Sequence, residues 1–234
     1  MTSLTIHRVT TLDLAVRPLV WPFAEERRAD IAVHFAEKQR ERPKLWNGRV
    51  LLGRDAVFTD DHLAATYFET DFASFLAWRD WGFPDAAVFN GFGMGALRTS
   101  DGAFVMGEMA QHTSNAGRIY FPSGTPDLND VKGGVLDIPG SVVRELAEET
   151  GLTAADYTVE VDWHCVVSGR AIAMIKVLNL DMPGDQARAR IEANLAREDE
   201  PELSAIHLVR GMSDLTPTMP RFVTAFIEQQ FASR

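Results

Sequence analysis

The chain has 234 residues, of which 46% are hydrophobic and 24% charged, and its formal net charge at pH 7 is −10. This composition is typical of a soluble globular protein, and the acidic balance argues against a protein that binds a nucleic-acid polymer through a basic surface. It does not exclude a nucleotide substrate, because a metal ion can screen phosphate charges locally.

The single cysteine, Cys165, excludes an intrachain disulfide and favours a reducing compartment. Its neighbours over residues 161–167 resemble a strand, so we interpret it as a buried thiol rather than a nucleophile. The sequence has no signal-peptide pattern and no apolar run near the roughly 18 residues that a membrane span needs. These features predict a cytoplasmic protein without a membrane association.

Residues 1–85 are predicted to form an N-terminal α+β extension, and residues 86–234 a second domain. The boundary is placed at residues 82–85, where Gly-Phe-Pro-Asp interrupts the pattern. No low-complexity linker separates the two parts, so we expect them to pack together. The elements expected in the extension are an edge strand over 4–9, a helix over 23–41, strands over 49–58 and 62–70, and a helix capped by Asp71.

Residues 86–234 are predicted to contain both strands and helices. Asp101-Gly102 supplies a tight turn between two apolar segments. The glycines at 91, 93 and 95 are interpreted as sites of close packing, because no helix follows them as dinucleotide binding requires. The expected strands cover 88–98, 103–109, 118–121, 157–167, 171–180 and 203–209, and the expected helices cover 139–150, 185–197 and 216–231.

Three carboxylates share one face of the helix that ends at Gly151. Glu145, Glu148 and Glu149 are i, i+3 and i+4 neighbours at helical spacing. Each like-charged pair costs about 0.2 to 0.5 kcal/mol in an isolated helix, and Arg144 offsets only part of that cost. Clustered carboxylate oxygens suit a hard divalent cation such as Mg2+, which commonly shares its coordination with substrate phosphates. The pattern therefore indicates a metal site.

The segment from Arg144 to Leu152, Arg-Glu-Leu-Ala-Glu-Glu-Thr-Gly-Leu, resembles the second half of the Nudix box, G-x5-E-x7-R-E-U-x-E-E-x-G-U with U apolar. Every specified position of that half is matched. The resemblance covers residues 88–210 best and implies an α/β fold, the Nudix α/β/α sandwich with a mixed sheet. It implies a Mg2+-dependent pyrophosphohydrolase, with Mn2+ as an alternative ion, that cleaves a nucleoside diphosphate linked to another moiety by water attack at phosphorus.

The resemblance also assigns roles to residues of this chain. It implies that Glu148 and Glu149 bind metal, and that Glu145 binds a second ion or acts as a base. The carbonyl of Gly124 is expected to complete the metal shell. Arg144 is expected to orient Glu148 or Glu149.

The first half of the box departs from the pattern. Leu136 stands where counting back from Arg144 requires glutamate. If the box starts at Gly124 instead, Asp130 stands six residues later, where the pattern has its first glutamate, and a longer loop over residues 129–134 must precede Arg144. The role of the family's first carboxylate thus falls to Asp130 or to Asp137, or this carboxylate is absent.

Further contacts are implied around the box. The loop ahead of the family glycine lies beside the metal site in the family, so His112 and Arg118 are candidate phosphate contacts. An acid from outside the box often joins the site, which makes Glu200 and Glu202 candidates.

Only missing motifs restrict the range of candidate substrates. No proline occurs between Leu152 and Pro183, so the proline associated with ADP-ribose specificity is missing. What remains is a nucleoside diphosphate linked to a sugar or another small group. The altered box supports an alternative, a nucleotide or sugar-phosphate sensor without catalysis. A diphosphate-lipid isomerase is disfavoured because Cys165 lies in a strand, and a homodimer, common in the family, is not established by any pattern here.

Overall fold

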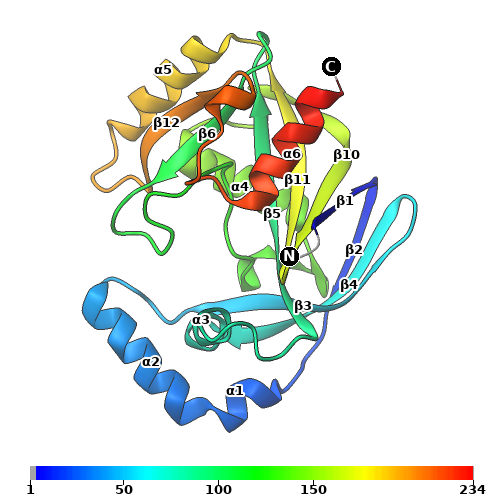
Figure 1. Ribbon diagram of the computed structural model, residues 1–234, viewed down its shortest axis with the longest axis vertical. Helices are drawn as coiled ribbons and strands as arrows, with labels where there is room; N and C mark the ends of the chain where they lie inside the picture. Colours follow the sequence, from blue (N-terminus) through cyan, green and yellow to red (C-terminus); the bar gives the residue numbers. More distant parts are fainter. Residues whose placement is uncertain (1–3, 234) are drawn as a thin grey trace.

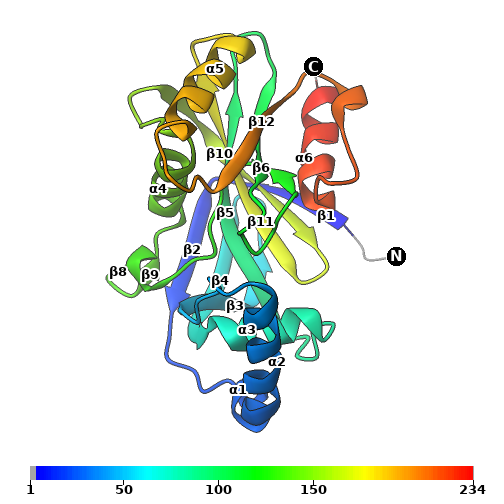
Figure 2. The same ribbon diagram turned by 90° about the vertical axis from the view of Figure 1, so that its left-hand side faces the viewer.

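A mixed sheet with helices on both faces forms the centre of the molecule, in a computed structural model that describes residues 4–233 (Figures 1 and 2). The predicted α/β class with a mixed sheet is confirmed. The strands are β1 (Leu4–Val9), β2 (Thr11–Val16), β3 (Arg49–Phe58), β4 (His62–Asp71), β5 (Val88–Arg98), β6 (Phe104–Met109), β7 (Ile119–Tyr120), β8 (Val131–Lys132), β9 (Val135–Leu136), β10 (Tyr157–Ser168), β11 (Ala171–Leu180) and β12 (Leu203–Val209). The helices are α1 (Pro22–Glu26), α2 (Arg28–Glu41), α3 (Phe72–Asp80), α4 (Ile138–Thr150), α5 (Gly184–Leu195) and α6 (Arg221–Ala232), with short 3-10 helices at Leu128–Asp130 and Met212–Asp214.

The strands follow the order β1-β10-β11-β5-β3-β4-β2-β9-β8, and β6 joins β5 to β12 and β7. Two pairs are parallel, β2 with β4 and β11 with β5, and the others are antiparallel. Strands of the N-terminal 85 residues hydrogen-bond to later strands at three places, β1 to β10, β2 to β9 and β3 to β5. One sheet thus runs through both parts of the chain, while the division at residue 85 stays a prediction.

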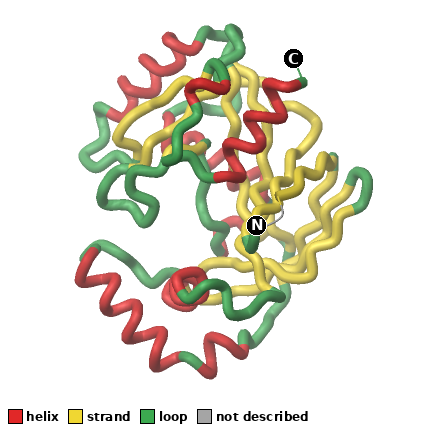
Figure 3. Tube along the Cα trace, in the orientation of Figure 1, coloured by secondary structure: helices red, strands yellow, loops and turns green. Residues whose placement is uncertain are grey.

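The helices of the N-terminal segment lie below the rest of the sheet in Figure 1. The single helix predicted over 23–41 is two helices, because the chain leaves helical geometry at Arg27, where φ is −106°. Asp71 caps α3 as predicted, and its carboxylate accepts the backbone N–H of Ser74 at 2.8 Å. In the tube view of Figure 3, α1 and α2 are connected to the strands before and after them by loops, whereas α3 directly follows β4.

Helix α4 packs directly on β5, which fixes the position of the acid cluster. A Cβ at Gly93 would lie 2.7 Å from a side-chain carbon of Val142 and 2.9 Å from one of Ile138, so only glycine admits the helix this closely. The glycines of β5 are therefore packing residues, as predicted. Helix α4 ends at Gly151, where φ is 71°, a left-handed conformation that favours glycine.

Two further expectations concern burial and membranes. Cys165 is buried and unpaired, and burial raises the pKa of its thiol to about 12. The thiol is therefore protonated at neutral pH, as expected for a core residue.

In the part of the chain that the structure describes, no helix has the length and apolar character to cross a membrane.

Candidate functional site

The three glutamates of α4 occupy different environments. Glu149 is 5% exposed, and its Oε1 accepts the backbone N–H of Ser123 at 3.0 Å. Glu145 is also largely covered, and it lies against Gly124, where an added Cβ would come within 2.2 Å of its Oε1. The side chain of Glu148 is 60% exposed. Two carboxylates thus face the loop at Ser123 and Gly124, and the third lies at the surface.

Arg144 links the carboxylates of this cluster. Its guanidinium lies 2.7 Å from Oε1 of Glu145 and 3.2 Å from Oε2 of Glu148, and it bonds Oδ1 of Asp130 at 3.0 Å. Glu149 makes no ion pair with it. The structure therefore brings Arg144 to Glu145 and Glu148, and holds Glu149 by a backbone amide.

The two aspartates that could replace the missing box glutamate have distinct positions. Asp130 is buried, 4% exposed, and reaches Arg144. Asp137 is instead the N-cap of α4, where it accepts the backbone N–H of Gly140 at 2.9 Å and pairs with Lys132. The extra residues before the helix form the β8–β9 hairpin, and this hairpin is joined to the sheet through β2. Of the two, Asp130 is the one that contacts the box.

Burial makes the two inner carboxylates hard to ionise. Burial raises the pKa of Glu149 to about 8; the Ser123 N–H opposes this, and the charges of Glu145, Glu202 and Glu148 add to it. Burial likewise raises the pKa of Glu145 to about 7, although Arg144 opposes the shift. A nearby cation would favour the charged forms of both.

The donor set fits a hard divalent cation. Within residues 4–233, no three His, Cys, Asp or Glu side chains converge as a ready-made metal cage, and Arg144 lies among the carboxylates. The cluster nevertheless holds four carboxyl groups beside one arginine, and a bound cation would favour the charged forms of the two buried ones. The missing side chain of Gly124 leaves its backbone close to the Glu145 carboxylate. Oxygen ligands of this kind are the ones that Mg2+ prefers.

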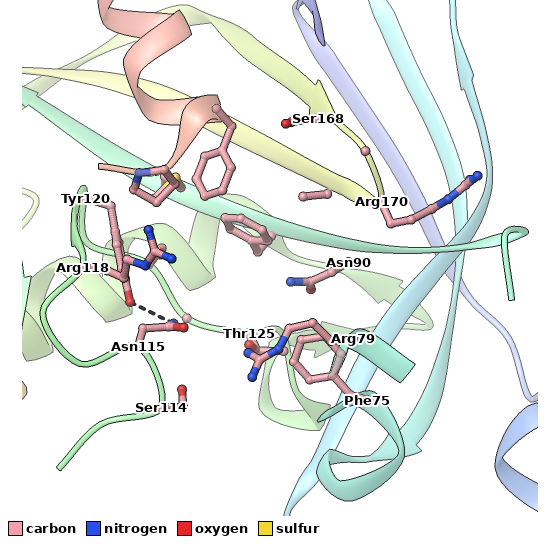
Figure 4. A pocket seen from close by; sticks show the side chains of 18 of the residues that line it. Phe75, Arg79, Asn90, Ser114, Asn115, Arg118, Tyr120, Thr125, Ser168 and Arg170 are labelled. Atoms are coloured by element: carbon pink, nitrogen blue, oxygen red, sulfur yellow. Dashed lines mark hydrogen bonds between the residues drawn. The ribbon is translucent and has the colours of Figure 1, made fainter. Parts of the chain in front are cut away.

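A cavity of about 1100 Å³ lies in front of this cluster (Figure 4). Ser123 and Gly124 belong to its wall, so Glu145 and Glu149 lie directly behind that wall. Its lining includes three arginines and no aspartate, glutamate or lysine. The residues that line it are Phe72, Phe75, Arg79, Gly82, Phe83, Asn90, Phe92, Met94, Ser114, Asn115, Arg118, Tyr120, Ser123, Gly124, Thr125, Val167, Ser168, Gly169, Arg170, Ala171, Pro220 and Phe222.

The other predicted site residues divide between this cavity and its surroundings. Arg118 lines the cavity, whereas His112 does not and lies near Glu200. Glu200 pairs with Lys44, whose Nζ lies 2.6 Å from its Oε2, and this bond lowers the pKa of Glu200. Glu202 instead raises the pKa of both buried glutamates by its charge. Of the two candidate acids, Glu202 is the one electrostatically coupled to the cluster.

Sequence reasoning missed several residues of the cavity. Asn90, Phe92 and Met94 all line it because alternate residues of β5 point to one face, a pattern visible in the sequence. Arg79 also lines it, from a helix far away in the chain. No local signal connects that helix with the acid cluster.

Comparison with protein-family models finds no match, and neither does comparison with curated proteins. Solved structures do resemble the chain. They include a Nudix hydrolase from M. smegmatis, RenU (TM-score 0.38, 14% identical, 61% of this chain and 83% of that one), a Nudix hydrolase from Nitrosomonas europaea (0.41, 13%, 62% and 70%), and the Nudix domain of Shewanella oneidensis NrtR complexed with ADP ribose (0.42, 14%, 68% and 97%). Identities and TM-scores this low leave the activity of this chain to be argued from its own residues.

Proposed function

We propose that the protein is a Nudix pyrophosphohydrolase that cleaves a nucleoside diphosphate linked to another moiety, with Mg2+ or Mn2+ as its cofactor. One observation carries the proposal: two buried carboxylates, Glu145 and Glu149, lie behind the wall of a cavity that is lined by arginines and by no acidic residue. Buried like charges are costly unless a cation accompanies them. A cavity of this polarity favours an anionic ligand.

The cation would be held by Glu145, Glu148 and Glu149, with the carbonyl of Gly124. When bound, it supplies Lewis-acid stabilisation of phosphoryl oxygens and lowers the pKa of a bound water. Of these ligands, Glu149 is fixed by the Ser123 N–H, and Glu148 is the exposed one.

The chain's own residues then orient the reaction. Arg144, anchored by buried Asp130, positions the carboxylates of Glu145 and Glu148. Glu145 either binds a second ion or acts as the general base. As the base, its carboxylate, which lies against Gly124 at the cavity wall, takes the proton of the attacking water. Arg118 binds phosphate oxygens from the cavity wall.

The cavity also suits the organic part of such a substrate. Its volume of about 1100 Å³ is slightly above the roughly 300 to 1,000 Å³ of most small-molecule sites, enough for a ligand with two parts joined by a diphosphate. Aromatic rings such as Phe92 and Phe222, whose centroids are 5.6 Å apart, offer faces for a base. A nucleotide sugar is one member of this class.

Product release over a panel of diphosphate compounds tests the proposal. The panel contains nucleoside diphosphate sugars, dinucleoside polyphosphates and ADP-ribose, each assayed with Mg2+ and with EDTA. We expect Mg2+-dependent cleavage of at least one compound, lost in Glu149→Gln. Tight binding of a compound without turnover would instead identify a sensor, which the altered first half of the box favours.

A further inference from the structure

The N-terminal segment supplies one wall of the cavity. Phe72, Phe75 and Arg79 come from α3, and Gly82 and Phe83 follow it, whereas the other lining residues come from residues 90–222. In Figure 4, Phe75 and Arg79 lie on one side of the cavity and Arg118 and Tyr120 on another. A ligand that fills the cavity therefore contacts both parts of the chain.

The three arginines of the lining differ in their partners. The guanidinium of Arg170 donates to the carbonyl of Ala86, and it points away from the other labelled side chains in Figure 4. The guanidinium of Arg118 has no ion pair or hydrogen bond to any residue that the structure describes. Arg118 is thus a cation in a wall that contains no acid, in a chain whose net charge is −10.

Arg79 has only a shared partner. Its Nε bonds Oδ1 of Asp80 at 3.1 Å, and the same carboxylate lies 3.1 Å from His34 and 3.7 Å from Lys38. One carboxylate thus serves three basic groups. Within residues 4–233, the terminal nitrogens of Arg79 donate to no protein acceptor, and its guanidinium carbon lies 6.0 Å from the Phe75 ring. The terminal nitrogens of Arg79 are therefore available to a ligand.

Helix α3 presents Arg79 from a fixed position. The first turn is capped by Asp71, and Asn47 accepts the backbone N–H of Ala73 at 2.7 Å. At the other end, Trp78 is fully buried and its Nε1 donates to the carbonyl of Asp85 at 3.0 Å. The backbone that carries Arg79 therefore needs no ordering when a ligand binds, which favours affinity.

We propose that Arg79 is a substrate-binding residue which, with Arg118, holds the diphosphate of the substrate from two sides of the cavity. The guanidinium fork matches phosphate oxygens and forms charge-assisted hydrogen bonds. Asn90 adds a neutral contact, because its carboxamide makes no hydrogen bond to the described protein and its Oδ1 is buried. This inference rests on the proposed function, since the diphosphate is the group on which that function acts. It makes the N-terminal segment part of the substrate site.

Binding and kinetics of matched arginine variants test this assignment. Arg79→Ala and Arg79→Lys are compared with Arg28→Ala, a control at an exposed arginine of α2 that pairs with Glu25. The binding probes are α,β-methylene analogues of ADP and UDP, titrated by calorimetry with Mg2+. We expect Arg79→Ala to weaken binding and to raise KM by about tenfold or more, as for loss of a charged hydrogen bond, with kcat within about twofold. Arg79→Lys should recover part of the loss, and Arg28→Ala should match wild type.

The outcomes separate this inference from the proposed hydrolysis. Wild-type binding and KM in Arg79→Ala, or no binding of either analogue to the wild-type protein, overturns the role of Arg79 even if turnover is normal. A fall in both kcat and melting temperature in Arg79→Ala, with no recovery in Arg79→Lys, also overturns it, because such a result shows that the substitution disturbs the structure. Binding that depends on Arg79 but without turnover of any diphosphate supports the inference and refutes the hydrolase.

Discussion

Replacing Glu149 by glutamine should stabilise the metal-free protein at neutral pH. Burial raises the pKa of Glu149 from the ordinary 4.5 to about 8. An acid with a raised pKa binds more protons in the folded state, so its stability contribution is complete below pH 4.5 and is lost as the pH rises toward 8. At about 1.4 kcal/mol per pH unit, the free energy of unfolding lost by pH 7 is about 3 kcal/mol.

Glutamine has nearly the shape of glutamate, can accept the same Ser123 N–H and carries no charge. Urea denaturation in EDTA from pH 5 to pH 8.5 measures the effect. We expect wild type and Glu149→Gln to have similar stability near pH 5, and the variant to be more stable by about 2 to 3 kcal/mol at pH 7. Glu192→Gln, at an exposed position on α5, is the control. Parallel pH profiles for wild type and Glu149→Gln, or a less stable variant at pH 7, would refute the reasoning.

Two other substitutions test the geometry around the cluster. Gly124→Ala places a Cβ 2.2 Å from Oε1 of Glu145, so that carboxylate must move, and we expect loss of both hydrolysis and Mg2+-dependent thermal stabilisation. Gly211→Ala, where a Cβ meets nothing within 4 Å, should leave both unchanged, and equal behaviour of the two variants would contradict the close contact. Asp130→Asn removes the charge that anchors Arg144. We expect urea denaturation to show a free energy of unfolding lower by about 1 to 3 kcal/mol, and we expect slower turnover at saturating substrate. Wild-type values for both would show that Asp130 does not position the arginine.

The box helix could be predicted because its information is local. The spacing of three glutamates, a glycine suited to a left-handed end and apolar residues at helical intervals all lie within residues 138–151. The same holds for the Asp71 cap and for most strands, whose ends carry clear turn residues. The break at Arg27 has no such signal, since neither glycine nor proline marks it.

The composition of the site depends on contacts between distant segments, which a single sequence does not specify. The sequence left Asp130 and Asp137 as alternatives, and only the hairpin of β8 and β9 brings the first to Arg144 while the second caps the helix. Arg79 lines the cavity because β3 pairs with β5 on one side and with β4 on the other, and α3 directly follows β4. Glu200 and Glu202 differ in their interactions, because Glu200 pairs with Lys44 whereas the charge of Glu202 acts on the buried carboxylates.

Direct titration of the protein with Mn2+, followed by electron paramagnetic resonance, tests the central claim that the carboxylates of α4 hold a divalent cation. We expect saturable Mn2+ binding to wild type and to the Glu192→Gln control, competition by Mg2+, and severe weakening in Glu145→Gln and Glu149→Gln. Wild-type affinity in both site variants, or no saturable binding to the wild-type protein, would contradict it.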